Sequence, residues 1–196
     1  ASLEKVDQVL KMSFRMRLQS QTAEGRRRLV SITTDGSATP LIFARGPAAH
    51  LSYHQQAKTQ ASVVLSTRPL PPSVAPPPLV SLTPPPPPPP PAPSLCSSSS
   101  SVYASELVDY DCSIEPAVAG VTMHYRTSIT FLHVQVQAQG APSGWIGLGF
   151  ASSMFGATAV IGLPGDSTVK LYRLGGYSAA DVTVLPDQSD LEGASL

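Results

Sequence analysis

The sequence predicts an all-β protein that contains an antiparallel β-sandwich, and three observations support this fold class. Within the expected strand at residues 129–138, apolar Leu132, Val134, Val136 and Ala138 alternate with polar residues, which is the period of a strand with one buried face. The same alternation runs through Met12, Phe14, Met16 and Leu18 near the N-terminus. From Val102 onward, short apolar segments recur about every 8–12 residues with turn residues between them, as is typical of sandwiches.

Composition divides the chain into three zones. Residues 69–93 contain 15 prolines, and Ser97–Ser101 follows shortly after them. Proline removes backbone donors, and this stretch has too little apolar content to form a core. We therefore expect residues 69–101 to be a disordered linker, a polyproline II rod followed by a serine hinge. The flanking residues 1–68 and 102–196 are expected to form separate units.

The two flanking zones carry opposite charge, although the whole chain of 196 residues balances 13 basic against 13 acidic side chains. Residues 1–68 hold ten basic and four acidic residues, whereas residues 102–196 hold three basic and nine acidic ones. This asymmetry supports two separate units. The only basic cluster, Arg26–Arg28, lacks interleaved aromatic residues, so nucleic acid is not an expected partner.

Turn residues bound most of the expected strands. The C-terminal segments expected to be strands are residues 121–125, 129–138, 145–150, 157–163 and 169–174. In the N-terminal zone, residues 29–32, 41–43 and 51–53 are shorter candidates. Residues 10–60 loosely resemble a piece of a concanavalin-like or laminin-G-like jelly roll. The N-terminal zone is therefore expected to be a partial β-rich segment.

The segment Trp145–Phe150 indicates a ligand slot. Gly147 and Gly149 fall on one face of the expected strand, and their missing side chains leave room for a flat ligand, a crossing backbone or a large neighbour. Trp145 is interpreted as a core residue, with direct ligand contact as the alternative. The residues expected to line the slot are Trp145, Gly147, Gly149 and Phe150.

The same segment carries a family resemblance. Gly144–Phe150 reads Gly-Trp-Ile-Gly-Leu-Gly-Phe, Met154 follows, and a Gly-Ala pair at Gly156 opens the next expected strand. On these motifs, residues 105–196 resemble the DOMON domain. One position departs from the family pattern, because Thr158 stands where the family usually has Asp.

The resemblance implies an immunoglobulin-like sandwich, which is expected to be incomplete here, and a choice of ligands. Some DOMON domains hold b-type haem between a Met and a His, and others are thought to bind sugars. Met154 matches the haem-ligating Met, so haem b is a candidate cofactor, with an ordinary loop or core methionine as the alternative. The family's ligand His is expected beyond Leu196, and neither His124 nor His133 matches its position. We therefore expect this chain alone not to hold six-coordinate haem.

The two cysteines, Cys96 and Cys112, leave three possibilities open. They can pair with each other, pair with cysteines outside this chain, or stay free thiols. Neither lies in a Cys-x-x-Cys pair or beside a histidine cluster, so no metal site is predicted. His50 and His54 are interpreted as exposed polar residues.

No catalytic residue is predicted, because the common hydrolase, zinc-protease and phosphate-loop motifs are missing from the sequence. Asp109 and Asp111 are interpreted as surface acids. No apolar run approaches the ~20 residues of a membrane-spanning helix.

The expected function is a secreted or cell-surface ligand-binding module, with haem-based electron transfer as its sharper form. The resemblance implies a transmembrane cytochrome b module as a neighbour in the parent protein. Two alternatives stay open. One is a carbohydrate-binding module that uses the polar strand face of Gln135, Gln137 and Gln139. The other is a structural wall or matrix protein in which the proline-rich rod is the functional part.

Overall fold

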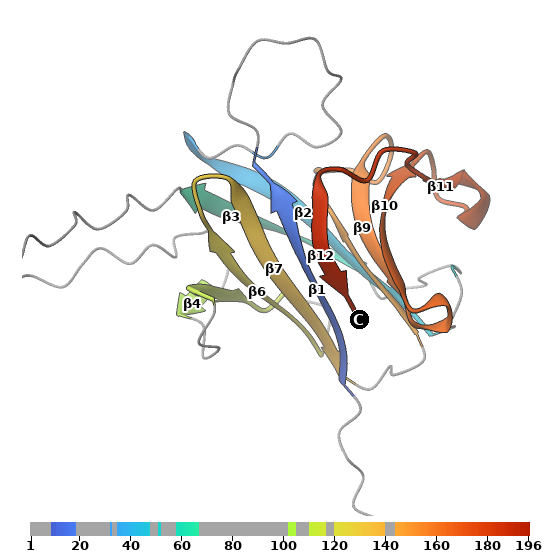
Figure 1. Ribbon diagram of the computed structural model, residues 1–196, viewed down its shortest axis with the longest axis horizontal. Helices are drawn as coiled ribbons and strands as arrows, with labels where there is room; N and C mark the ends of the chain where they lie inside the picture. Colours follow the sequence, from blue (N-terminus) through green and yellow to red (C-terminus); the bar gives the residue numbers. More distant parts are fainter. Residues whose placement is uncertain are drawn as a thin grey trace, which may run out of the picture.

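The computed structural model describes residues 9–18, 32, 35–47, 51, 58–66, 102–104, 110–116, 120–139 and 144–196. These residues form two antiparallel sheets that face each other, which confirms the predicted all-β sandwich (Figure 1). The strands are β1 (Val9–Arg17), β2 (Asp35–Gly46), β3 (Lys58–Ser66), β4 (Val102–Ala104), β5 (Cys112–Ile114), β6 (Val121–Thr127), β7 (Phe131–Gln139), β8 (Trp145–Gly149), β9 (Thr158–Leu163), β10 (Thr168–Leu174), β11 (Val182–Val184) and β12 (Leu191–Ser195). Two short 3-10 helices, η1 (Pro164–Asp166) and η2 (Ala179–Asp181), lie in turns.

The order of the strands interleaves distant parts of the sequence. Sheet A has the order β12-β1-β7-β6-β5-β4, and sheet B has the order β11-β10-β9-β8-β2-β3. β1 pairs along its whole length with β7, from Val9 opposite Gln139 to Arg17 opposite Phe131. On its other side β1 pairs with β12, and in sheet B β2 pairs with β8.

The strands before and after the proline-rich stretch therefore build both sheets together. This differs from the predicted division into a partial N-terminal unit and a separate C-terminal sandwich. The physical reason is that the apolar face of β1 completes the inner face of sheet A, where it lies beside the alternating apolar residues of β7. Charge asymmetry between the zones does not decide this pairing, since net charge bears on solubility and association more than on fold.

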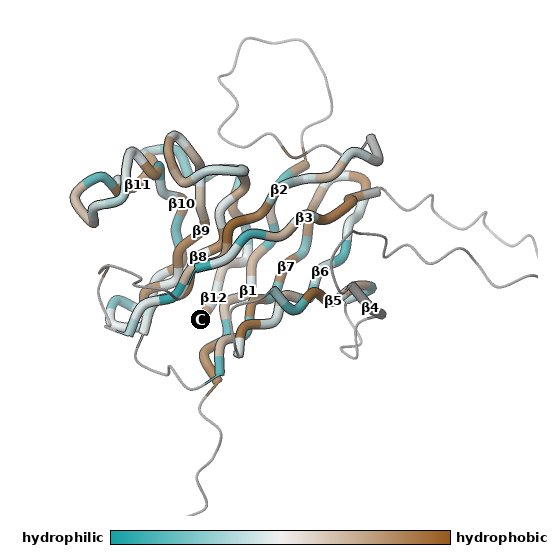
Figure 2. Tube along the Cα trace, turned by 180° about the vertical axis from the view of Figure 1, so that it is seen from behind, coloured by the Kyte–Doolittle hydropathy of each residue, from teal (hydrophilic) through white to brown (hydrophobic). Residues whose placement is uncertain are grey.

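The core between the sheets follows the strand period that the sequence predicted. β7 alternates between buried and half-buried residues, and its buried positions are Leu132, Val134, Val136 and Ala138. β1 does the same with Leu10, Met12, Phe14 and Met16. The alternation is visible along the strands in Figure 2, where the tube passes repeatedly between hydrophobic and hydrophilic colours. Sheet B contributes Leu41, Phe43, Ile146, Leu148, Val160 and Leu171 to the same core.

Tyr125 is a polar exception in this core. Its side chain is 3% exposed, and its hydroxyl has no hydrogen-bond partner among the described residues. Burial raises the pKa of Tyr125 to about 12, because the charged phenolate would be poorly solvated there. The hydroxyl is thus desolvated without compensation.

Replacing this residue, Tyr125→Phe, is expected to raise the free energy of unfolding by about 1 kcal/mol, since it removes an unpaired buried hydroxyl and keeps the ring. Urea unfolding followed by circular dichroism measures the change. Tyr177→Phe is the control, because Tyr177 is 64% exposed and its hydroxyl can reach water. A clear loss of stability in Tyr125→Phe would contradict the conclusion that the Tyr125 hydroxyl has no hydrogen-bond partner.

Candidate functional site

Strand alternation gives sheet B a second apolar face, which points away from sheet A. Ile146 and Leu148 of β8 lie in the core between the sheets, whereas Trp145 belongs to a separate cluster on the outer face. The buried members of this outer cluster are Trp145, Ala157, Ala159, Ile161, Leu163, Tyr172 and Leu174. An apolar face of this kind, partly covered by loops, is where a ligand can replace solvent.

A cavity of about 50 Å³ opens on this outer face. Its volume is several times the ~10–15 Å³ that one water needs, and well below the ~150 Å³ of a cavity known to admit benzene. Its lining consists of Ile42, Ala44, Leu51, Trp145, Gly147, Gly149, Met154, Ala159, Ile161, Leu174, Gly176, Tyr177, Ser178, Ala179 and Val182. Trp145, Ala159 and Ile161 are buried, whereas Tyr177 and Ser178 are exposed and form the mouth.

Glycines on β2 and β8 make room for the Trp145 ring. A Cβ built on Gly46 would overlap the indole, at 2.6 Å from Cε2 and 2.7 Å from Cδ1. A Cβ on Gly147 would lie 3.3 Å from Cζ3 at the other end of the ring. The indole therefore lies along the sheet over two residues without side chains. At Gly149 a Cβ would make only ordinary contacts, the nearest at 3.5 Å. The missing side chain at this position therefore leaves space at the bottom of the cavity.

The loop between β8 and β9 brings Met154 to the cavity. Gly156 adopts a φ of 75°, and its N–H donates to the carbonyl of Leu174 at 2.7 Å. The N–H of Ala157 donates to the carbonyl of Met154 at 3.2 Å. Gln60 on β3 reaches across and donates through Nε2 to the carbonyl of Ser152 at 2.8 Å. These bonds fix the loop on both sides of the half-buried Met154 side chain.

The loop after β10 forms the mouth. The Ser178 hydroxyl caps η2 and accepts from the N–H of Ala180 at 3.1 Å. The carboxylate of Asp181 accepts in return from the N–H of Ser178 at 3.1 Å, which completes a capping box. This reciprocal cap holds the loop so that Tyr177 and Ser178 stand at the edge of the cavity.

The structure brings together most of the residues expected to line a slot. Trp145, Gly147, Gly149 and Met154 all border this cavity. Phe150 does not: it is half-buried against the core between the sheets. The strand period explains the difference, because Phe150 shares the parity of Ile146 and Leu148 and not that of Trp145.

Sequence reasoning did not find the other walls of the cavity. Ile42 and Ala44 come from β2, which pairs with β8 although about a hundred residues separate the two strands. The mouth residues come from a polar segment after β10. The only available signal was the apolar stretch Leu41–Phe43, which predicted a strand but not its neighbour.

The donor atoms among the described residues do not fit a six-coordinate haem. Met154 lines the cavity and would offer a thioether sulfur, a soft neutral ligand. The two histidines in the described part of the chain, His124 on β6 and His133 on β7, both belong to sheet A. A cavity of about 50 Å³ is also too small to enclose a porphyrin.

The pair Ser113 and His124 is a nucleophile–base contact that sequence reasoning did not consider. Their Oγ and Nδ1 atoms lie 2.6 Å apart on neighbouring strands of sheet A. The side chain of Ser113 has no exposed surface, so a substrate cannot reach its hydroxyl. The contact is therefore interpreted as a structural hydrogen bond.

The glutamine side chains considered for sugar binding lie on the outer face of sheet A and bond to their neighbours. Gln135 donates through Nε2 to the Ser13 hydroxyl at 3.1 Å, and Gln137 donates through Nε2 to Gln135 Oε1 at 2.7 Å. Gln139 is exposed at the end of β7. Two of the three amides therefore hydrogen-bond to neighbours on this face, and sugar binding by this face stays a prediction.

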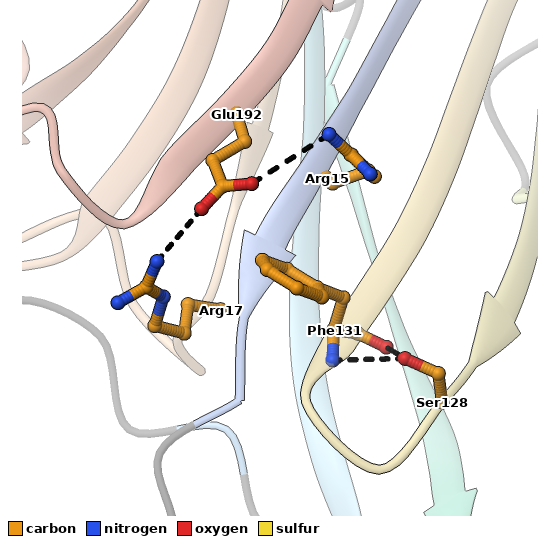
Figure 3. A network of polar contacts seen from close by, with 5 residues as sticks. All are labelled: Arg15, Arg17, Ser128, Phe131 and Glu192. Carbon is orange, nitrogen blue, oxygen red and sulfur yellow. Dashed lines mark hydrogen bonds and ion pairs between the residues drawn. The ribbon is translucent and has the colours of Figure 1, made fainter.

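On the same outer face of sheet A, a group of charged and aromatic side chains joins β1, β7 and β12, as Figure 3 shows. Arg17 donates to Glu192 Oε1 at 2.8 Å, and Arg15 lies 3.6 Å from Glu192 Oε2. Both guanidinium groups also lie over the Phe131 ring, at 5.4 Å and 5.8 Å from its centroid. The pKa of His133 on the same face is lowered by burial first, and then by the positive charges of Arg126 and Arg15.

Cys112 on β5 is disulfide-bonded. Cys96, the partner considered from the sequence, lies outside the described residues, as do His50, His54, Asp109 and Arg26–Arg28. Asp111 is half-buried just before β5.

Comparisons of this chain with protein-family models, with curated proteins and with solved structures find no match. In the part of the chain that the structure describes, no helix has the length and apolar character needed to cross a membrane.

Proposed function

We propose that this chain is a ligand-binding module whose cavity on the outer face of sheet B holds a narrow apolar group. One observation carries the proposal: Trp145, Gly147, Gly149 and Met154 border one apolar cavity whose mouth is exposed. Apolar pockets with few polar groups at their edge are the usual form of small-molecule sites. The resemblance of residues 105–196 to the DOMON domain supports the same function.

Titration with 1-octanol tests this proposal, because the sequence contains a single tryptophan, Trp145, which lines the cavity. We expect saturable changes in its fluorescence. The variant Ala159→Leu should weaken binding by at least about tenfold, since Ala159 is 3% exposed and a larger side chain would occupy the cavity.

The control is Val184→Leu, on edge strand β11, where the side chain is 50% exposed and outside the cavity lining. It should bind like the wild type. Circular dichroism confirms that both variants fold. No saturable response in the wild type, or equal binding by folded Ala159→Leu, would overturn the proposal.

Haem is a separate case, because the described residues provide one thioether and no second axial ligand. Adding haem to this chain is expected to give no low-spin spectrum, that is, no sharp α and β bands on reduction. Absorption spectroscopy of the wild type and of Met154→Ala measures this. A six-coordinate spectrum that Met154→Ala abolishes would contradict the expectation and assign the sulfur as a ligand.

We also propose a secreted or cell-surface location. The disulfide of Cys112 supports it, because disulfides form and persist in oxidising compartments. Non-reducing peptide mapping of the protein from its native source should find Cys112 oxidised, and a free thiol there would count against the proposal.

A further inference from the structure

Apart from the indole Nε1 of Trp145, which is buried and has no hydrogen-bond partner among the described residues, the polar side-chain groups of the cavity lie at its mouth. Its buried lining is made of apolar side chains and glycines, including Trp145 and Ile161, and contains no charged side chain. Tyr177 and Ser178 at the exposed end carry the hydroxyls. An occupant that matches this distribution has an apolar end for the floor and a polar end for the mouth.

Lys58 supplies a positive charge beside the mouth. It lies on β3 directly opposite Ala44, one of the lining residues. Its Nζ lies 5.8 Å from the centroid of the Tyr177 ring, another lining residue. Within the described ranges no carboxylate forms an ion pair with Lys58, and the Asp181 carboxylate, which lies beside the lining residue Gly176, caps η2.

Ser178 supplies a second donor. Its oxygen accepts from the N–H of Ala180, so the hydroxyl proton stays available for an acceptor at the mouth. Lys58 can only donate, and the Ser178 hydroxyl still has a proton to donate while its oxygen accepts from Ala180. The shared chemistry at the mouth therefore fits an anionic oxygen group.

The size of the cavity restricts the apolar end. A volume of about 50 Å³ lies below that of a cavity known to admit benzene, so only the terminal carbons of an alkyl chain fit inside it and the rest of the chain lies along the open mouth. We propose that the occupant is a straight-chain carboxylic acid, with its alkyl end over Gly147 and Gly149 and its carboxylate beside Lys58 and Ser178. This inference rests on the proposed function and adds the class of ligand.

The test compares octanoate with 1-octanol, both titrated into the whole chain at pH 7 with Trp145 fluorescence as the signal. The two probes share the alkyl chain, and only octanoate is charged, since carboxylic acids of this kind ionise well below pH 7. Octanoate is expected to bind about fivefold more tightly than 1-octanol, the size of an exposed ion pair. Lys58→Gln should remove this preference and leave the affinity for 1-octanol unchanged.

The matched control is Lys11→Gln on β1, an exposed lysine on the outer face of sheet A. It should keep the preference for octanoate. Equal affinity for the two probes in the wild type, or a preference that survives Lys58→Gln, would overturn the carboxylate assignment while the cavity proposal stands. Failure of both probes to bind would overturn both proposals.

Discussion

Truncating Phe14 to alanine is expected to lower the free energy of unfolding of the whole sandwich by about 3–5 kcal/mol. Phe14 is 2% exposed and lies on the inner face of β1, in the core between the sheets. β1 is an interior strand of sheet A, with β7 on one side and β12 on the other. A cavity at this position removes contacts from both sheets at once.

Urea unfolding followed by Trp145 fluorescence measures this change, because Trp145 lies in sheet B and reports from the other layer. If the sandwich unfolds as one cooperative unit, the mutation in sheet A shifts the transition seen in sheet B. Lys11→Ala is the control on the same strand, where the side chain is exposed and the expected change is within about 0.5 kcal/mol. An unchanged Trp145 transition in Phe14→Ala would mean that the N-terminal and C-terminal strands fold separately.

The second large effect is expected at Gly46, which is buried opposite Trp145 on the neighbouring strand. In Gly46→Ala the new methyl group would overlap the indole, and the ring would have to leave its place over Gly147. Overpacking of this kind costs about 1–3 kcal/mol, and we expect the upper end because the overlap is with a rigid ring. The fluorescence maximum of Trp145 should shift to the red as the indole becomes more exposed.

Gly149→Ala serves as the comparison. Its Cβ would meet its nearest atom, the Cβ of Ile42, at 3.5 Å, so the methyl group fits without displacement. We expect a change within about 1 kcal/mol and an unshifted emission maximum. Equal destabilisation by the two variants would show that the loss of glycine, and not the contact with Trp145, determines the effect.

Local structure could be predicted from the sequence wherever one side of a strand is buried. The alternation in β1 and β7 gave both strands and their inner faces, because the side-chain period of a strand is two residues. β3 was not predicted, since only Val63 and Leu65 are fully buried and the other residues of 58–65 are half-buried or exposed. An edge strand with so little buried surface gives a weak pattern.

The pairing of strands could not be predicted in the same way. Alternation shows which residues of β2 face a core, but it does not show that Ala44 lies opposite Gly147. Such pairs join distant parts of the chain, and many registers would satisfy the same local pattern. Opposite charge in the two zones then suggested two units, although apolar faces decide the pairing.

The candidate site likewise has one part that could be predicted from local sequence and another part that could not. Trp145, Gly147 and Gly149 share a parity within one strand, so their common face could be predicted from five residues of sequence. Phe150 was assigned to that face against its parity. The mouth depends on the cap of η2, where Ser178 and Asp181 satisfy each other, and nothing in the composition of that polar segment indicates that it lies beside a cavity.

The strands on either side of the proline-rich stretch decide whether that stretch can act as a spacer between domains. The stretch lies outside the described residues and connects, in sequence, β3 with β4, the outermost strands of sheet B and sheet A. Because β3 and β4 belong to the same sandwich, the length of the connection between them does not set a distance between two domains. Doubling the length of a flexible connection adds only about 0.6 kcal/mol of closure entropy, so evolution can lengthen or shorten it while the sheets keep their register.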